Sequence, residues 1–237
     1  MAAVLEAEGL ARAFNGVQAL DGVDLRVEPG DMIALVGPNG AGKTTLLNVL
    51  TGQQVPDRGR VTIAGRDVSS RAPSHRARWP AVRTYQNAGM FLRLTAVDNV
   101  AVAAVSRGQS HRAAVKVAWE VLARLGMDPM GGERADRLSG GQKKLVDFAR
   151  TLVVSDAQVA LLDEPTAGVN PALSEILAVQ IRKRQEEGMA FVIVSHDLPW
   201  VFELCPRVMV LAQGQRLMVG TPEEVTNDPR VIDAYLA

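Results

Sequence analysis

The octapeptide GPNGAGKT occupies residues 37–44 and matches the pattern G-x-x-x-x-G-K-[ST]. It follows the apolar stretch MIALVG, which is typical of a buried strand, and it opens KTTLLNVL, which has helical spacing. In such a strand, loop and helix the glycines let backbone N–H groups turn inward around phosphate oxygens. A glycine-rich turn without a ligand is the alternative, but this setting favours a nucleotide site. The expected contacts are Gly37, Pro38, Asn39, Gly40, Ala41, Gly42, Lys43, Thr44 and Thr45.

Four side chains are expected to carry the chemistry of this site. Lys43 should place its charge at the β- and γ-phosphates, and the Thr44 hydroxyl should ligate Mg²⁺. Asp163 ends the apolar stretch VALLD, where a buried carboxylate is costly unless it is paired or bound to a metal. Asp163 is therefore a candidate Mg²⁺ ligand, and Glu164 is a candidate for polarising the attacking water. The alternative is a solvated Asp-Glu pair at the start of a loop.

Outside this loop, predicted strands and helices alternate along the chain. Residues 31–37, 158–165 and 189–197 predict buried strands, and residues 59–68 predict a hairpin turned near Gly65. Helices are expected over 43–52, 95–105, 111–127, 139–154 and 170–188. This alternation predicts an α/β fold with a mainly parallel sheet covered on both faces. Ligands of such a sheet bind at the carboxyl ends of its strands.

Composition narrows the classes of function. The 237 residues contain 26 basic and 26 acidic side chains, so no general attraction to DNA or RNA is visible. The single cysteine, Cys205, cannot form an internal disulfide, and the first residues lack the layout of a secretory signal. No apolar run has the length that a membrane span requires. These features predict a cytoplasmic protein that reaches a membrane only through a partner.

A second glycine-containing helix start lies at residues 138–142, LSGGQ. Two interpretations of it are open. In the first, the glycines expose N–H groups to a second phosphate at a positive helix end; in the second, Ser139 simply caps the helix beside flexible glycines. The lysines that follow, Lys143 and Lys144, are predicted to lie on a solvated face.

LSGGQ, placed between the phosphate loop and a strand ending in Asp-Glu, resembles the signature of ATP-binding-cassette (ABC) ATPases, and the resemblance spans essentially the whole chain. It implies a P-loop NTPase core over 1–86 and 146–237 with an antiparallel β subdomain, and a helical lobe over 87–145. It also implies that two cassettes, identical or related, enclose two ATP molecules. The phosphate loop of one subunit then faces the signature of the other. The signature contacts would be Ser139, Gly140, Gly141 and Gln142.

Three further residues gain roles from the resemblance. Phe14 matches the aromatic residue that stacks on adenine, although a hydrophobic plug under the N-terminal strands is an alternative. Gln86, in RTYQN, matches a catalytic glutamine that contacts Mg²⁺ and water. His196, in FVIVSHD, matches the histidine that contacts the γ-phosphate and orients the catalytic glutamate. One position departs from the pattern: Asn170 stands where an aspartate that links the two ATP sites is usual. Asn170 is equally suited to capping the helix that follows.

The resemblance implies a transport ATPase with Mg²⁺ and ATP as cofactors, peripheral on the inner face of the membrane. Its partners would be membrane-spanning permease subunits, a second cassette and, indirectly, a solute-binding protein. Residues 83–100 and 220–237 resemble the ATPase subunits of importers for branched-chain or other hydrophobic amino acids, amides or urea. Residues 86–92 are expected to receive a permease helix; closure of the lobe's own core by Met90, Phe91 and Leu92 is the alternative. Two other hypotheses compete with this one. The first is a soluble cassette for DNA repair, translation or chromosome organisation, and the second is a module that binds ATP without hydrolysing it.

Overall fold

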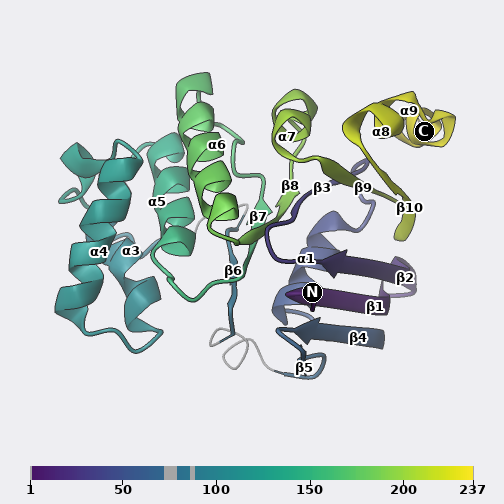
Figure 1. The fold of residues 1–237 in the computed structure, drawn as a ribbon, viewed down its shortest axis with the longest axis horizontal. Coiled ribbons are helices and arrows are strands. Elements are labelled where there is room, and N and C mark those ends of the chain that lie inside the picture. The colour runs from purple at the N-terminus through teal and green to yellow at the C-terminus, as the bar shows by residue number, and fades with distance from the viewer. Residues whose placement is uncertain (1, 72–78, 86–88, 237) are drawn as a thin grey trace.

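The computed structural model describes residues 2–71, 79–85 and 89–236. Within them the strands form two sheets, and the helices lie mainly on the far side of the larger sheet from the smaller one (Figure 1). The predicted catalytic residue Gln86 lies outside the described residues. No helix in the described ranges has the length and apolarity needed to cross a membrane.

The larger sheet runs through the middle of the molecule. Its order is β10-β9-β3-β8-β7-β6, and all neighbours are parallel except the antiparallel pair β9 and β10. Every residue of β7 and β8 is buried, as continuous apolar runs require in a parallel sheet. The strands are β3 (Met32–Val36), β6 (Ala81–Arg83), β7 (Val159–Asp163), β8 (Ala190–Val194), β9 (Arg207–Ala212) and β10 (Gln215–Gly220).

The smaller sheet is antiparallel, with the order β2-β1-β4-β5. The hairpin predicted over 59–68 is present, because Ala64 and Gly65 form its turn with positive φ angles of 48° and 73°. Asn15 and Gly16 turn the first hairpin in the same way, which is the preferred sequence for a two-residue turn. The strands are β1 (Leu5–Phe14), β2 (Val17–Val27), β4 (Arg58–Ile63) and β5 (Arg66–Asp67).

Helix boundaries follow local capping signals. Asn170 caps α6 through a hydrogen bond from the Leu173 amide, with Pro171 in the first turn, as the sequence predicts. Residues beyond His196, which the sequence analysis left without elements, form β9, β10 and three short helices. The helices are α1 (Lys43–Thr51), α3 (Ala96–Val105), α4 (His111–Arg124), α5 (Gly140–Leu152), α6 (Pro171–Glu186), α7 (Leu198–Leu204), α8 (Pro222–Asn227) and α9 (Pro229–Leu236).

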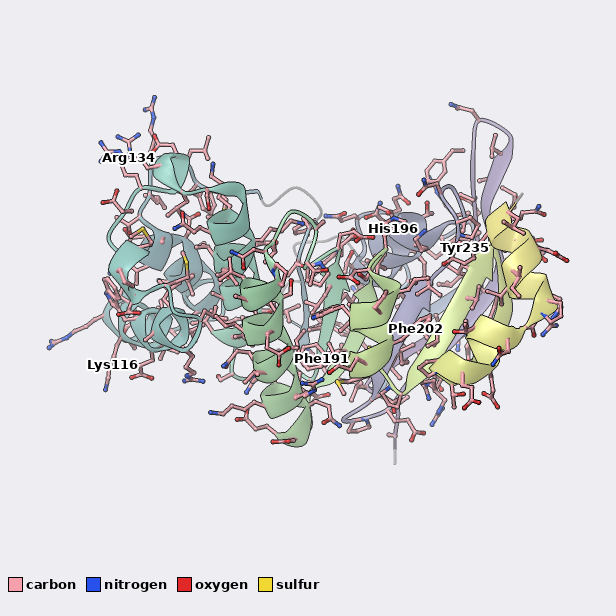
Figure 2. All side chains as sticks on the ribbon, turned by 90° about the horizontal axis from the view of Figure 1, so that it is seen from above. Lys116, Arg134, Phe191, His196, Phe202 and Tyr235 are labelled. Carbon is pink, nitrogen blue, oxygen red and sulfur yellow. The ribbon has the colours of Figure 1, made fainter. Side chains whose placement is uncertain are left out.

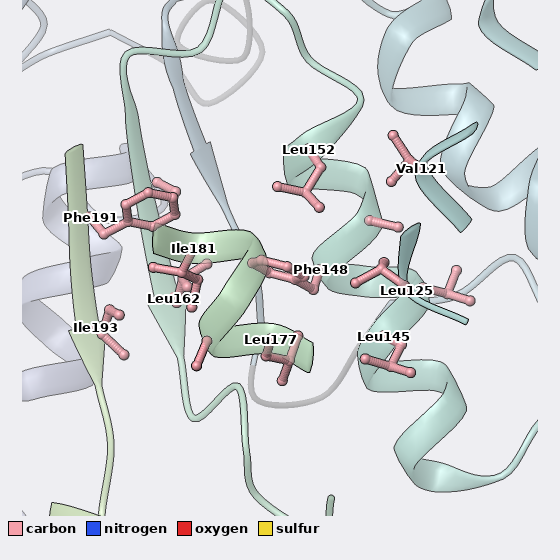
Figure 3. Close-up of a cluster of buried hydrophobic side chains, with 14 of the residues drawn as sticks. Val121, Leu125, Leu145, Phe148, Leu152, Leu162, Leu177, Ile181, Phe191 and Ile193 are labelled. Carbon is pink, nitrogen blue, oxygen red and sulfur yellow. The ribbon is translucent and has the colours of Figure 1, made fainter. Parts of the chain in front are cut away.

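Two hydrophobic clusters cover opposite faces of the large sheet. Alternate residues of β8 separate them, since Phe191 belongs to the cluster under the helices and Val192 to the cluster shared with the small sheet. Phe148 of α5 is fully buried in the first cluster, where Figure 3 places it between Leu177 of α6 and the rest of α5. Helix α5 is therefore packed into the same core as the sheet that carries the predicted chemistry.

Candidate functional site

The loop after β3 has a backbone that requires glycine. Gly37 has φ +147° and Gly42 has φ +102°. A Cβ atom on Gly37 would lie 2.1 Å from the Leu211 carbonyl oxygen, and one on Gly42 would lie 2.4 Å from the Ala19 carbonyl oxygen. Gly42 is also the N-cap of α1, and no side chain caps this helix start. The first amides of α1 are thus left to face the adjoining cleft.

Lys43 is buried within this loop. Its Nζ donates hydrogen bonds to the carbonyl oxygens of Gly37 at 2.7 Å and Pro38 at 2.9 Å. Burial lowers the pKa of Lys43, although the negative charges of Glu164 and Asp163 act in the opposite direction. The loop therefore presents a confined cation between its own carbonyl oxygens and two acidic side chains.

A cleft of about 250 Å³ opens over α1 and the ends of β7 and β8. Backbone amides, the cation of Lys43 and two carboxylates line it together, a combination that suits a phosphate bound with a divalent cation. The described residues contain no group of three or more His, Cys, Asp or Glu side chains that could hold a metal by themselves. The lining is Ala19, Asn39, Gly40, Ala41, Gly42, Lys43, Thr44, Thr45, Asp163, Glu164, Val194 and His196.

Asp163 is held by a buried partner that the sequence analysis missed. The Nη2 atom of Arg83 lies 3.0 Å from Oδ2 of Asp163, and both side chains are about 95% buried, with 5% and 4% exposed. Arg83 also donates to Asn48 and Thr51 of α1. The Thr84 hydroxyl accepts a hydrogen bond from the Asp163 amide. Strand β6 therefore fixes the carboxylate of Asp163 against the helix that follows the phosphate loop.

Glu164 has an unusual backbone and an equally constrained side chain. Its φ angle is +51°, a left-handed conformation that few residues other than glycine adopt. Its Oε2 atom accepts a hydrogen bond from the His196 amide at 3.2 Å, and Nε2 of His196 lies 3.3 Å from Oε1. Burial raises the pKa of Glu164, and the His196 amide opposes that shift. A carboxylate with a raised pKa at the edge of a phosphate cleft is suited to accept a proton.

The prediction that Lys144 lies on a solvated face is wrong. Its Nζ donates a hydrogen bond to the Glu164 carbonyl oxygen at 2.9 Å, and burial lowers the pKa of this lysine. Periodicity along α5 did not reveal this contact, because the partner comes from the end of a different element, β7. Lys143, by contrast, makes no side-chain hydrogen bond or ion pair within the described part of the chain.

The start of α5 is closed by its own side chains. Ser139 accepts a hydrogen bond from the Gln142 amide, and the Gln142 side chain accepts one from the Ser139 amide. These two bonds form a capping box. Ser139 and Gly140 are exposed, so the capped helix end faces outward. The capping role considered for Ser139 is present, and the amides of Gly140 and Gly141 point along the same helix axis.

Comparison with known proteins shows the family to which this chain belongs. The family described as ABC transporter matches residues 20–167, and that described as branched-chain amino acid ATP-binding cassette transporter matches residues 215–236. The high-affinity branched-chain amino acid transport ATP-binding protein BraF of Pseudomonas aeruginosa is 34% identical, with 98% of this chain and 97% of that protein covered. The probable LivG protein of Archaeoglobus fulgidus is 32% identical over 98% of this chain and 95% of its own length. The chain belongs to the ABC transporter family.

A solved cassette structure agrees with this assignment. The ADP conformation of an ATP-binding cassette of an ABC transporter superposes with a TM-score of 0.87 at 30% identity, over the full length of both chains. The cassette fold expected from the sequence is therefore confirmed: a mostly parallel sheet with an antiparallel β subdomain. The present cassette binds ATP and hydrolyses it to energise transport.

Two other predicted contacts lie at the edges of the cassette. Phe14 ends β1 with 36% of its surface exposed, which contradicts a buried plug, and the Arg12 guanidinium lies 4.9 Å from its ring centre. Phe91 and Leu92 are about half exposed, whereas Met90 packs on the core. Of the three residues expected either to close the core of the lobe or to face a partner, Met90 therefore does the first, and Phe91 and Leu92 are free to do the second.

A buried polar network near the segment that carries Gln86 was also missed. Asp147 accepts a hydrogen bond from the Tyr85 amide at 3.1 Å, and Arg150 donates to the Gly89 carbonyl oxygen at 3.0 Å. Arg150 also donates to the side chain of Asn99, which in turn bonds the Phe91 backbone in both directions. Asp147 and Arg150 lie on the face of α5 opposite to its predicted apolar face, so helical periodicity gave no signal for these contacts. The network ties both flanks of this segment to α5 and α3.

Proposed function

We propose that this cassette drives the uptake of branched-chain amino acids or closely similar hydrophobic solutes. The match of residues 215–236 to the branched-chain cassette family carries this proposal, and relatives such as BraF support it. No residue of the cassette needs to touch the solute. The solute is instead selected by permease subunits and a solute-binding protein, while the cassette supplies free energy from ATP.

The phosphate loop supports the binding half of the cycle. Amides from the loop and from the start of α1 surround the phosphates of ATP, and Lys43 exchanges its carbonyl partners for phosphate oxygens. Adenine stacks on Phe14, whose ring is accessible at the end of β1. Thr44 and Asp163, together with Gln86, would hold Mg²⁺ beside the phosphates. Bound there, the ion neutralises charge that develops on the β- and γ-phosphates.

Glu164 supports the chemical half of the cycle. A water oxygen attacks the γ-phosphorus, the bond from that phosphorus to the β,γ-bridging oxygen breaks, and the water proton passes to the Glu164 carboxylate. Oε1 of Glu164 is buried, accepts no hydrogen bond from the described residues and lies 3.3 Å from Nε2 of His196. His196 orients the carboxylate through its amide and ring. Products are ADP and inorganic phosphate.

The second helix start supports assembly in pairs. A triphosphate needs one cradle from its own chain, and α1 provides it. The exposed end of α5, with Ser139, Gly140, Gly141 and Gln142, then serves the ATP held by a second cassette. The exposed side chains of Phe91 and Leu92 contribute to the groove that receives a short permease helix. In this arrangement the cassette is peripheral on the cytoplasmic face of the membrane.

The experiment is uptake by the full transporter in proteoliposomes. The cassette is reconstituted with its permease subunits and solute-binding protein, and ATP inside the vesicles is supplied in excess. Radiolabelled leucine and valine should accumulate with ATP, and they should stimulate hydrolysis. A Glu164→Gln cassette is the matched control and should give no accumulation. Accumulation of urea or an amide, with neither leucine nor valine transported, would refute the assignment of the solute.

A further inference from the structure

The backbone at Glu164 is in a conformation that the residue does not prefer. A left-handed φ in a residue other than glycine costs about 1–3 kcal/mol and persists only where the surroundings determine it. Pro165 adds to the constraint, because a residue before proline is biased toward extended backbone. The direction in which the Glu164 carboxylate leaves the end of β7 depends on this conformation. Whatever fixes the Glu164 backbone therefore also aims its side chain at the cleft.

Backbone contacts from two neighbouring segments fix this residue. The Glu164 amide donates to the Val194 carbonyl oxygen at 2.9 Å, which continues the pairing of β7 with β8. The Glu164 carbonyl oxygen accepts from the Ala167 amide at 3.3 Å and from Nζ of Lys144 at 2.9 Å. The first two contacts belong to the strand end and its turn. Among these three partners, Lys144 is the one that contacts Glu164 through its side chain, and it comes from a helix rather than from the sheet or its turn.

The position of Lys144 on α5 connects it to the start of that helix. It lies in the second turn of α5, after the capping box that closes the exposed helix end. Its ammonium group is half-buried among Asp147, Asp163 and Glu164, so the side chain has little freedom to leave. Since the backbone of α5 is rigid over one turn, Lys144 joins the start of this helix to the backbone of Glu164. The Lys143 side chain next to it has no such contact among the described residues.

We propose that Lys144 is a positioning residue that holds Glu164 in its hydrolytic orientation and links that orientation to the start of α5. This inference rests on the proposed roles of Glu164 and of the α5 start in a pair of cassettes. When the second cassette's ATP binds at Gly140 and Gly141, a small shift of α5 moves Nζ and hence the Glu164 carbonyl. Each cassette thereby adjusts its own water-activating group to the nucleotide held by its neighbour.

The test uses the complete transporter with Lys144→Met, which keeps the aliphatic stem and removes the donor. Lys144→Arg keeps a donor, and Lys143→Met is the matched control one residue away. We expect Lys144→Met to lower kcat for ATP about 10- to 100-fold, the scale of a misplaced catalytic group, with KM changed less than about twofold. It should also bring the Hill coefficient for ATP toward one. Lys144→Arg should recover most of kcat, and Lys143→Met should match the parent.

Separate outcomes overturn the inference and the proposed function. Glu164→Gln is measured in the same preparation. If it hydrolyses ATP normally, Glu164 does not activate the water and the proposed chemistry fails. If Glu164→Gln is inactive but Lys144→Met keeps the parent kcat and Hill coefficient, only the positioning role of Lys144 fails. A parallel fall in kcat and in melting temperature that Lys144→Arg does not rescue would make the contact purely structural and would also refute the inference.

Discussion

Two helices of the cassette have a glycine at or just before their first residue, and their first backbone amides are capped in opposite ways. Helix α1 follows Gly42, which has a left-handed conformation and offers no side chain to the helix amides. Helix α5 follows Ser139, which caps it and takes part in a reciprocal bond with Gln142. The first start is enclosed by Lys43 and two carboxylates, while the second is exposed.

This difference distinguishes a complete phosphate-binding site, at α1, from a partial one, at α5. In the proposed function, open amides, a confined cation and flanking acids let the start of α1 hold a triphosphate without help from another chain. The α5 start is already satisfied in a single chain, so a phosphate there gains only the remaining amides and the helix dipole. In the proposed pair of cassettes, such a weak terminus becomes useful because the second cassette brings a phosphate that is already bound. The predictions below test this division, beginning with the largest expected effect.

Removing the positive charge of Lys43 at the start of α1 should have the largest effect, which is on the affinity for ATP. In Lys43→Ala the β- and γ-phosphates lose a buried ammonium group, and we expect the affinity for ATP to fall about 100-fold or more. Isothermal titration calorimetry on the isolated cassette measures this directly. Lys143→Ala, the corresponding charge on α5, is the control and should leave the affinity unchanged. Equal losses in the two variants would end the distinction between the two helix starts.

Replacing a glycine by alanine should affect stability differently near the two helix starts. Gly37→Ala introduces a Cβ atom 2.1 Å from the Leu211 carbonyl oxygen at φ +147°, and we expect a loss of about 2 kcal/mol or more in stability. Gly140 has no atom within 4 Å of a built Cβ, and it has no positive φ. Gly140→Ala should therefore be neutral or stabilising by up to about 1 kcal/mol. Chemical denaturation monitors both, and a stable Gly37→Ala would contradict the tight loop geometry.

A bulky cation at the α5 start should affect only the assembled transporter. Ser139→Arg removes the cap and blocks the exposed helix end, so turnover of the full complex should fall about tenfold or more. ATP affinity of the isolated cassette should stay within about twofold of the parent. Paired calorimetry and phosphate-release assays distinguish the two quantities. An affinity loss in the isolated chain would show that the α5 start serves its own nucleotide.

The smallest expected effect is on the pH dependence of the melting temperature in Glu164→Gln. Because burial raises the pKa of Glu164 above its ordinary value of 4.5, ionising this group opposes folding, and Glu164→Gln removes that penalty. The variant should melt on the order of 1–4 °C above the parent at pH values above the raised pKa. The advantage should shrink as the pH falls through that pKa and vanish below 4.5. Thermal melts across this range check the sign, and an advantage that grows toward acid pH would contradict it.

Local sequence predicted those parts of the site that are contiguous or that end a strand. The phosphate loop is one uninterrupted motif, and Asp163, Glu164 and His196 each follow an apolar run, so the topology of a parallel sheet brings them to one edge. Their individual roles stay predictions. Arg83 and Lys144 could not be found in this way, because their partners lie 80 and 20 residues away on other elements. The Asn15-Gly16 turn was a local signal that the analysis overlooked.

The pairing of β3 has a consequence for the order in which the nascent chain can fold. Both neighbours of β3 come late, since β8 spans residues 190–194 and β9 spans 207–212, and Gly37 itself packs on the Leu211 backbone. A ribosome adding ~5–20 residues per second needs on the order of ten seconds or more to supply them. Until then the strand that leads into the phosphate loop has no sheet to join. Cassettes that lack these strands should therefore be unable to bind ATP, so nucleotide cannot act as a folding template until residues 190–212 have been made.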